Sequence, residues 1–188
     1  MHIGTKAKKK ILSLRENILV QKAIKGDRGA YGKLYKIYVD PIYRYIYFRI
    51  GEDEETAQDL TQETFMKAWE NMNSFKTQKG TFKAWVYTIA RNITIDYFRV
   101  NNKSIRITES FIDEKQDLEK EIILKDEVNG MFTAIKKLPT NQKEILILSY
   151  VNELSNREIS KILNKNSDTL RSLKYRALKN LKKEINHE

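Results

Sequence analysis

Basic side chains are concentrated in a short segment near the C-terminus. Between residues 169 and 183 the chain has no acidic residue. Guanidinium and ammonium groups bind DNA phosphates and the O6 and N7 acceptors of guanine. The alternative is a merely solvated basic face, but like charges without counter-charges repel one another along a helix. The segment therefore predicts a nucleic-acid-binding surface that contains Arg171, Lys174, Arg176, Lys179, Lys182 and Lys183.

Local signals before and within this segment predict a helix-turn-helix at about residues 155–174. Ser155-Asn156-Arg157-Glu158 has the spacing of a capping box. Asn164 suits a left-handed turn after the short helix that follows. Ser167 can then cap a second helix, whose leucines and alanine at 170, 173, 177 and 181 share one face.

The apolar face of the second helix points inward, which leaves its other side for DNA. Arg171 and Lys174 lie in the N-terminal half, which enters the major groove most deeply, and are the predicted base-reading residues. Arg176 and Lys179 are predicted to contact phosphates or to lie in solvent. The full set of candidates is Ser167, Thr169, Arg171, Ser172, Lys174, Tyr175, Arg176 and Lys179.

A second constellation lies at residues 59–72. Leu60, Thr64 and Ala68 share one helical stripe, and Asp59, Gln62 and Glu63 lie on the opposite side. This pattern by itself is typical of any amphipathic helix on a protein surface.

A third constellation covers residues 73–99. The spacing places Trp85, Ile89, Ile93 and Tyr97 in the core, and it makes a polar stripe from Thr88, Asn92, Asp96 and Arg99, with Arg91 beside it. The preceding loop carries Phe75, Lys76 and Lys79. Aromatic and basic side chains together can hold single-stranded bases by stacking and charge. On spacing alone, a helix that only builds the core is an equal alternative.

The elements that position these residues are predicted to be helices, and the fold class is all-α. Glycine (7) and proline (2) are scarce, and the apolar spacing is helical throughout. We predict a basic tail at 1–17, a helical domain at 18–100, an acidic linker at 101–127 and a second helical domain at 128–188. Within the domain at 18–100, Pro41 can begin one helix. A second helix starts in the acidic stretch 51–55, and a third runs from Phe82 to about Val100.

Composition excludes several classes of protein. The chain has no cysteine, and its two histidines, His2 and His187, lie at the ends. We therefore expect no metal site and no enzymatic activity. We also expect no cofactor. No apolar run approaches a membrane span or a signal peptide, which predicts a cytoplasmic protein without membrane insertion. The net charge of +10 favours a polyanionic partner.

Four segments together resemble the extracytoplasmic-function sigma factors of bacterial RNA polymerase. They are "AQDLTQETFMKAWENMNSF", "GTFKAWVYTIARNITIDYFR", "LPTNQKEILILSYVNELSNREISKILN" and "SDTLRSLKYRALKNLKK". The resemblance covers about residues 18–100 and 128–185, with no counterpart of sigma regions one and three. It implies that the chain binds core polymerase and directs promoter-specific initiation.

The resemblance also implies a role for each block. Residues 59–72 would dock on the clamp helices of the largest polymerase subunit, through Asp59, Leu60, Gln62, Glu63 and Phe65. The C-terminal domain would meet the flap region, and its helix-turn-helix would bind the minus-thirty-five element. Recognition and melting of the minus-ten element would fall to Phe75, Lys76, Lys79, Trp85, Arg91, Asn92, Asp96 and Arg99.

The sequence departs from the family pattern at two places in the second helix of the helix-turn-helix. Asp168 stands where the family usually has glycine, and Leu173-Lys174 stands where many members have Arg-Leu, so the basic register of that helix is not fixed. The alternative function is a helix-turn-helix regulator that does not bind core polymerase, although such a protein has no need of the 59–69 block. The resemblance also admits an anti-sigma protein as a partner.

Overall fold

The computed structural model describes residues 5–51, 53–78, 80–105 and 134–185. Every regular element in these ranges is helical, as the all-α prediction requires. The elements are α1 (Thr5–Ile24), α2 (Arg28–Ile50), α3 (Glu54–Glu70), the 3₁₀ turn η1 (Met72–Ser74), α4 (Phe82–Ile105), α6 (Thr140–Leu146), the π-helical turn η2 (Ile147–Val151), α7 (Asn156–Leu163) and α8 (Ser167–Ile185).

The first helix begins earlier than the sequence predicted. Helix α1 includes residues from Thr5 onward, so most of the predicted tail at 1–17 is helical. This stretch is rich in lysine and leucine and has no glycine or proline between Thr5 and Lys25, so nothing in it breaks a helix. Gly26 then turns the chain with a φ of 89°, and Asp27 caps α2 through the amide of Ala30.

Pro41 lies inside α2, so the prediction that it begins a helix was wrong. The helix continues because Tyr38, Ile42 and Tyr45 are all buried on one face across the proline. Proline lacks the amide hydrogen that would bond the carbonyl of Ile37, and its ring crowds that carbonyl. Since Ile37 is about half exposed, water can reach that part of the helix.

Helix α3 starts in the acidic stretch, as predicted. The carboxylate of Asp53 accepts hydrogen bonds from the amide and the hydroxyl of Thr56, and these bonds lower the pKa of Asp53. Glu54 and Glu55 occupy the first turn, where they suit the positive end of the helix dipole. The helix ends at Glu70, slightly before the predicted end near Met72.

Helix α4 is longer than predicted and buries a different stripe. It continues to Ile105, into the first residues of the predicted linker; the remainder of that linker lies outside the described residues. Val86, Tyr87 and Ala90 are fully buried, whereas the predicted core residues Trp85 and Ile89 are only half-buried. The difference arises because α4 packs against α2 and α3 on one side and against α7 on the other.

The C-terminal helices follow the local signals closely. Pro139 precedes α6, and Ser155 and Glu158 form the predicted capping box at α7. Asn164 has the predicted left-handed conformation, with a φ of 50°. One detail was wrong: Ser167 is the first residue of α8, and the cap is Asn166, whose Oδ1 accepts from the amide of Thr169 at 2.8 Å. The preceding predicted helix positions 128, 131 and 132 lie outside the described residues.

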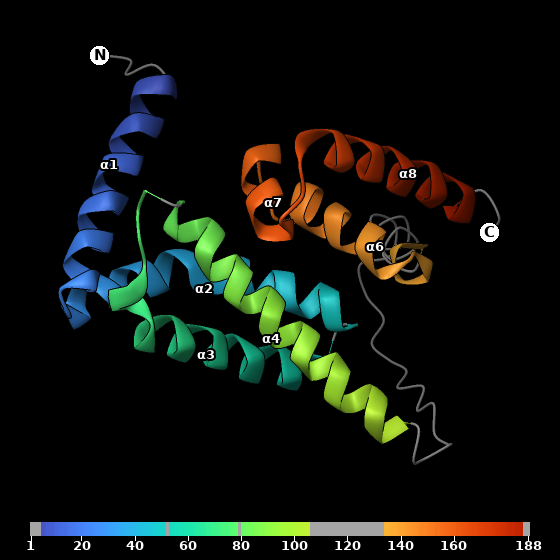
Figure 1. The fold of residues 1–188 in the computed structure, drawn as a ribbon, viewed down its shortest axis with the longest axis horizontal. Helices are drawn as coiled ribbons and strands as arrows, with labels where there is room; N and C mark the ends of the chain where they lie inside the picture. The colour runs from blue at the N-terminus through green and yellow to red at the C-terminus, as the bar shows by residue number, and fades with distance from the viewer. Residues whose placement is uncertain (1–4, 52, 79, 106–133, 186–188) are drawn as a thin grey trace, which may run out of the picture.

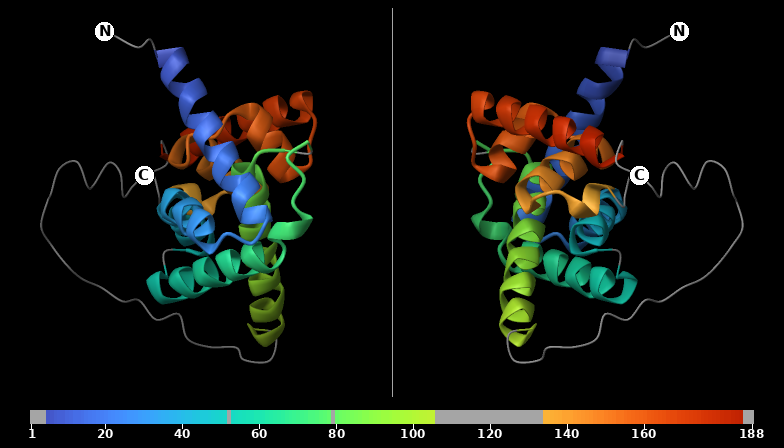
Figure 2. Two further views of the ribbon diagram at one scale, coloured as in Figure 1. Left: turned by 90° about the vertical axis from the view of Figure 1, so that its left-hand side faces the viewer. Right: turned by 90° about the vertical axis from the view of Figure 1, so that its right-hand side faces the viewer.

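The N-terminal helices α1–α4 and the C-terminal helices α6–α8 form two groups that pack against each other (Figure 1). Helix α4 contacts α7, and α2 contacts η2, so one hydrophobic core includes residues from both groups. The side chain of Asn152 donates to the carbonyl of Pro41 at 2.8 Å across this junction. Both views of Figure 2 show α3 and α8 on opposite sides of the molecule, with α2, α6 and the N-terminal part of α4 between them.

Candidate nucleic-acid and protein interfaces

The outer face of α3 is acidic and exposed. Asp59 and Gln62 are exposed, and Glu63 is half-buried in an ion pair of 2.6 Å with Lys67 one turn later. The helix carries five acidic side chains and one lysine. A surface of this kind fits a basic protein surface.

Two of the five residues expected at this interface lie inside the domain instead. Leu60 is 9% exposed and Phe65 is 3% exposed. The carbonyl of Phe65 accepts a hydrogen bond from the hydroxyl of Tyr31, and its ring lies 4.8 Å from that of Tyr35. In this arrangement the two side chains position α3 on α2 and do not reach its outer face.

The expected stacking residue Phe75 is also buried. Its ring centroid lies 4.9 Å from Trp85 and 6.2 Å from Phe82, in an aromatic cluster that fixes the end of the 75–81 loop on α4. Phe75 therefore has no free ring face for a base in this arrangement. Trp85 belongs to the same cluster and is half-buried. Lys76 is exposed, and Lys79 lies outside the described residues.

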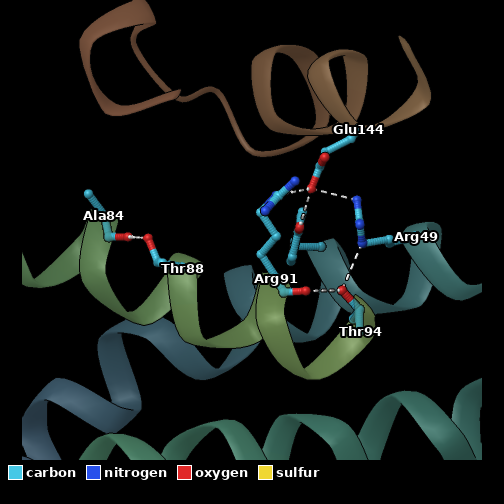
Figure 3. A network of polar contacts seen from close by, with 7 residues as sticks. Arg49, Ala84, Thr88, Arg91, Thr94 and Glu144 are labelled. Carbon is cyan, nitrogen blue, oxygen red and sulfur yellow. Dashed lines mark hydrogen bonds and ion pairs between the residues drawn. The ribbon is translucent and has the colours of Figure 1, made fainter. Parts of the chain in front are cut away.

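The polar stripe of α4 is present as predicted. Asn92, Asp96 and Arg99 are exposed, and the Arg99 guanidinium pairs with the Asp96 carboxylate at 3.1 Å. Thr88 is half-buried, and its hydroxyl donates to the carbonyl of Ala84 within the same helix (Figure 3). The free part of this stripe is thus its C-terminal half.

Arg91 lies beside that stripe but is drawn into a charged network (Figure 3). Its Nε lies 3.0 Å from Oε1 of Glu144, a residue of α6 that is only 4% exposed. The same oxygen lies 2.5 Å from Nη1 of Arg49 and accepts from the Tyr45 hydroxyl at 3.0 Å. Arg49 in turn donates from Nε to the Thr94 hydroxyl at 2.7 Å. One carboxylate from the C-terminal helices therefore joins α2 and α4.

The network was not predicted from the sequence. Burial raises the pKa of the Tyr45 hydroxyl, which therefore remains a hydrogen-bond donor to the carboxylate. A single acid before the apolar run 145–148 is an unusual feature that could have drawn attention to Glu144. Its partners could not have been inferred, because they lie 53 and 99 residues away along the chain.

Helix α8 presents the predicted basic face. Leu170, Leu173 and Ala177 are buried, which turns the opposite side outward. Lys174 is half-buried, and its ammonium lies 4.6 Å from the ring centroid of Tyr150 in a cation–π contact. The other candidates are exposed: Ser167, Thr169, Arg171, Ser172, Tyr175, Arg176 and Lys179.

A second charged contact crosses the junction between the helix groups. The Lys83 ammonium lies 3.5 Å from the carboxylate of Glu158, the capping-box residue of α7. Burial acts to raise the pKa of Glu158, but hydrogen bonds from Ser155 and the charge of Lys83 outweigh it and lower that pKa. The C-terminal helices are therefore held on α4 by ionic contacts near both Lys83 and Arg91.

Comparison with known proteins identifies the two helix groups. Residues 34–104 match the model for sigma-70 region 2, and residues 129–181 match the model for sigma-70 region 4. The sigma factor SigM of Bacillus subtilis is 32% identical over 155 residues, which cover 80% of this chain and 91% of SigM. The chain belongs to the extracytoplasmic-function sigma factors of the sigma-70 family. This sigma factor directs promoter-specific initiation of transcription and is a non-enzymatic subunit of RNA polymerase.

Other relatives agree with this assignment, and a solved structure shares the fold. SigW of Bacillus subtilis is 31% identical, with 88% of this chain and 94% of SigW covered. BldN of Streptomyces coelicolor is 34% identical over 90% of this chain, which spans 65% of BldN. The fold matches CnrH, solved with the cytosolic domain of CnrY, with a TM-score of 0.72 at 21% identity over 93% of this chain and 99% of CnrH.

The match to region 2 removes the alternative of a regulator that works without core polymerase. Among the described helices of this sigma factor, none is long and apolar enough to span a membrane.

Proposed function

We propose that this sigma factor binds core polymerase and the two promoter elements through three separate surfaces. The outer face of α3 binds core polymerase, the polar stripe of α4 with the loop before it recognises and opens the minus-ten element, and the basic face of α8 recognises the minus-thirty-five element. The observation that carries the proposal is the placement of α3 and α8 on opposite sides of the molecule (Figure 2). The exposed side chains of α3 are mainly acidic, and those of α8 are mainly basic. Polymerase and upstream DNA can then be bound at the same time.

The chemistry of α3 supports a protein partner rather than DNA. Its exposed carboxylates would repel phosphates, and they complement a basic surface such as the clamp helices of the largest polymerase subunit. The region-4 helices would contact the flap region of the polymerase. Asp59 and Gln62 supply direct contacts, and Leu60 and Phe65 hold the helix in place from below.

The proposed minus-ten surface predicts a defect in promoter opening. Asn92→Ala or Arg99→Ala should reduce permanganate reactivity of thymines at the minus-ten region about tenfold, because each removes a polar contact to an unpaired strand. Binding to core polymerase should be unchanged. Asn141→Ala and Arg28→Ala, which change exposed residues of α6 and α2, are the matched controls. If both α4 variants open promoters like the parent, this surface does not contact the strand.

The proposed minus-thirty-five surface predicts two kinds of effect on duplex binding. Arg171 is exposed and free of the cation–π contact that orients Lys174, so it is the stronger candidate for reading a base. Arg171→Ala should cost about 1–3 kcal/mol and relax the preference at one position. Lys179→Ala should weaken all sequences alike and reduce the salt slope by about one.

Both effects can be measured by selecting randomised upstream elements with the full chain bound to polymerase, at several salt concentrations. A uniform loss of affinity in Arg171→Ala, with an unchanged preferred sequence, would make Arg171 a phosphate contact and refute its base-reading role.

Run-off transcription tests the proposal as a whole. Core polymerase and a genomic promoter pool are incubated with and without this protein, and new transcripts are mapped. The proposal requires defined start sites that appear only with the protein, that are lost in the α3 variants described below, and that shift in preference with the α8 variants.

An anti-sigma protein is the further partner that we propose for this chain, which would act in the cytoplasm beside the polymerase. CnrH was solved with the cytosolic domain of CnrY, and RpoE of Bartonella quintana was solved with the anti-sigma factor NepR. Co-purification of the tagged chain from its own cells under non-inducing conditions would identify such a partner.

A further inference from the structure

We infer that Tyr45, Arg49 and Arg91 form a phosphate-binding site of region 2, which takes a backbone phosphate of the minus-ten strand when region 4 moves away. We call these three residues the arginine site. The inference rests on the proposed function, because it places the phosphate on the edge of the proposed minus-ten surface. Glu144 of region 4 occupies the site in the structure described above.

The first argument is the geometry of the donors. Two guanidinium nitrogens and one hydroxyl, from α2 and α4, meet at a single oxygen of Glu144 (Figure 3). Arg91 Nε and the Tyr45 hydroxyl each donate to it at 3.0 Å, and Arg49 Nη1 lies 2.5 Å away in an ion pair without hydrogen-bond geometry. A carboxylate and a phosphodiester present similar acceptor oxygens, and guanidinium groups bind both as paired donors. The arrangement therefore accepts an anionic oxygen group, with Glu144 as the occupant supplied by the chain itself.

The second argument is the balance of charge. Glu144 provides one negative charge against the two positive charges of Arg49 and Arg91. If region 4 leaves, both guanidinium groups lose this partner together. Arg49 is held at Nε by the Thr94 hydroxyl, so region 2 keeps its guanidinium oriented at the vacated position. A buried or half-buried cation of this kind favours replacement of the lost anion by another.

The third argument is the surroundings of the site. Arg91, Ile95 and Phe98 follow one another on one side of α4, directly beside the stripe of Asn92, Asp96 and Arg99. A cavity of about 420 Å³ lies next to Arg49 between the two regions, with Ile95 and Phe98 on its region-2 side and Lys136, Leu138, Thr140 and Lys143 on its region-4 side. Departure of region 4 would therefore uncover Ile95 and Phe98 beside the arginine site. A strand that crosses the exposed stripe can thus place a phosphate at the arginine site and a base near Phe98. These features favour a nucleic-acid strand over an acidic protein segment.

The test uses the full chain and a fluorescein-labelled single-stranded DNA 12-mer of mixed sequence, with fluorescence anisotropy at several salt concentrations. Glu144→Gln removes the competing charge and should raise affinity about tenfold, the effect of gaining a charge-assisted contact. The slope of log affinity against log salt should become steeper by about 0.7, the value for one more phosphate on a single strand. Glu153→Gln makes the same change of charge at an exposed residue of region 4 and should bind like the parent.

A second change separates the arginine site from a general unmasking of DNA-binding surface. Adding Arg49→Gln to Glu144→Gln should abolish the gain in affinity and the steeper slope. If the double variant loses helicity by circular dichroism, Arg91→Gln in the same background serves instead. A gain that survives both changes would overturn the inference. So would a Glu144→Gln variant that binds core polymerase more tightly but single-stranded DNA no better, because the arginine site would then take an acidic protein surface.

Run-off transcription with the parent chain distinguishes this inference from the proposed function. Absence of promoter-dependent transcripts would refute the proposed function. Transcripts from the parent, together with unaltered DNA binding by Glu144→Gln, would refute only the arginine site.

Discussion

Reversing the charges of Asp59 and Glu63 to lysine should abolish co-purification of the protein with core RNA polymerase. Both side chains lie on the outer side of α3, where acidic residues outnumber lysine five to one. Lysines at these positions would face a basic partner with like charge, which costs several kcal/mol, or about a hundredfold or more in affinity. The fold should be retained, because neither side chain is in the core.

The measurement is pull-down of core polymerase by the tagged variant at moderate salt, with helicity followed by circular dichroism. Asp40→Lys with Glu153→Lys carries the same change in net charge on exposed residues outside α3 and should still bind. Undiminished recovery of polymerase by the α3 variant would show that this face is not the dock. Single replacement of Glu63 should have the smaller effect, since Lys67 already neutralises part of its charge.

Replacing Glu144 by glutamine should detach region 4 from region 2. Glutamine keeps a hydrogen-bond acceptor but not the charge, so Arg49 and Arg91 would remain at the junction without a counter-ion. Removing one partner of a buried ionic group costs about 3–5 kcal/mol. The lower part of that range applies here, because Arg91 is 28% exposed and water can reach it.

Small-angle X-ray scattering provides the measurement, since a detached region 4 increases the radius of gyration of the free chain. Thermal unfolding of the variant should also begin at a lower temperature and lose cooperativity, as two separate domains would. Glu153→Gln controls for the change in net charge. A radius of gyration and a melting profile equal to those of the parent would show that Glu144 does not hold the two regions together.

Local signals in the sequence predicted the caps and turns of this fold well. The Ser155–Glu158 box and the left-handed Asn164 depend on hydrogen bonds between residues a few positions apart, which the sequence displays directly. The misplaced cap at Ser167 arose because Asn166 and Ser167 are both good cap residues, and only the geometry of the turn selects Asn166. Pro41 was misjudged because the burial of α2 outweighs the local preference of proline.

The parts of the site that failed to be predicted depend on contacts between distant segments. The spacing of α4 indicated one apolar stripe, but α7 of region 4 packs on a second side of this helix. Tyr87 is buried as well, with its ring against that of Tyr45 in α2. Phe75 was expected to face DNA as a loop aromatic, and its partners Phe82 and Trp85 explain why it is buried. The polar stripe from Asn92 to Arg99 was predicted correctly because it belongs to a single helix.

During translation, the arginines of the arginine site are synthesised before Glu144. Arg91 leaves the ribosome 53 residues ahead of Glu144. At about 5–20 residues per second, roughly 3–10 s pass between the two. Throughout that interval region 2 can fold with both arginines unopposed, beside a ribosome made largely of phosphate-rich RNA. If the arginine site binds phosphate as we infer, the nascent chain has a period of heightened affinity for nucleic acid, which ends when α6 has emerged and Glu144 pairs with the two arginines.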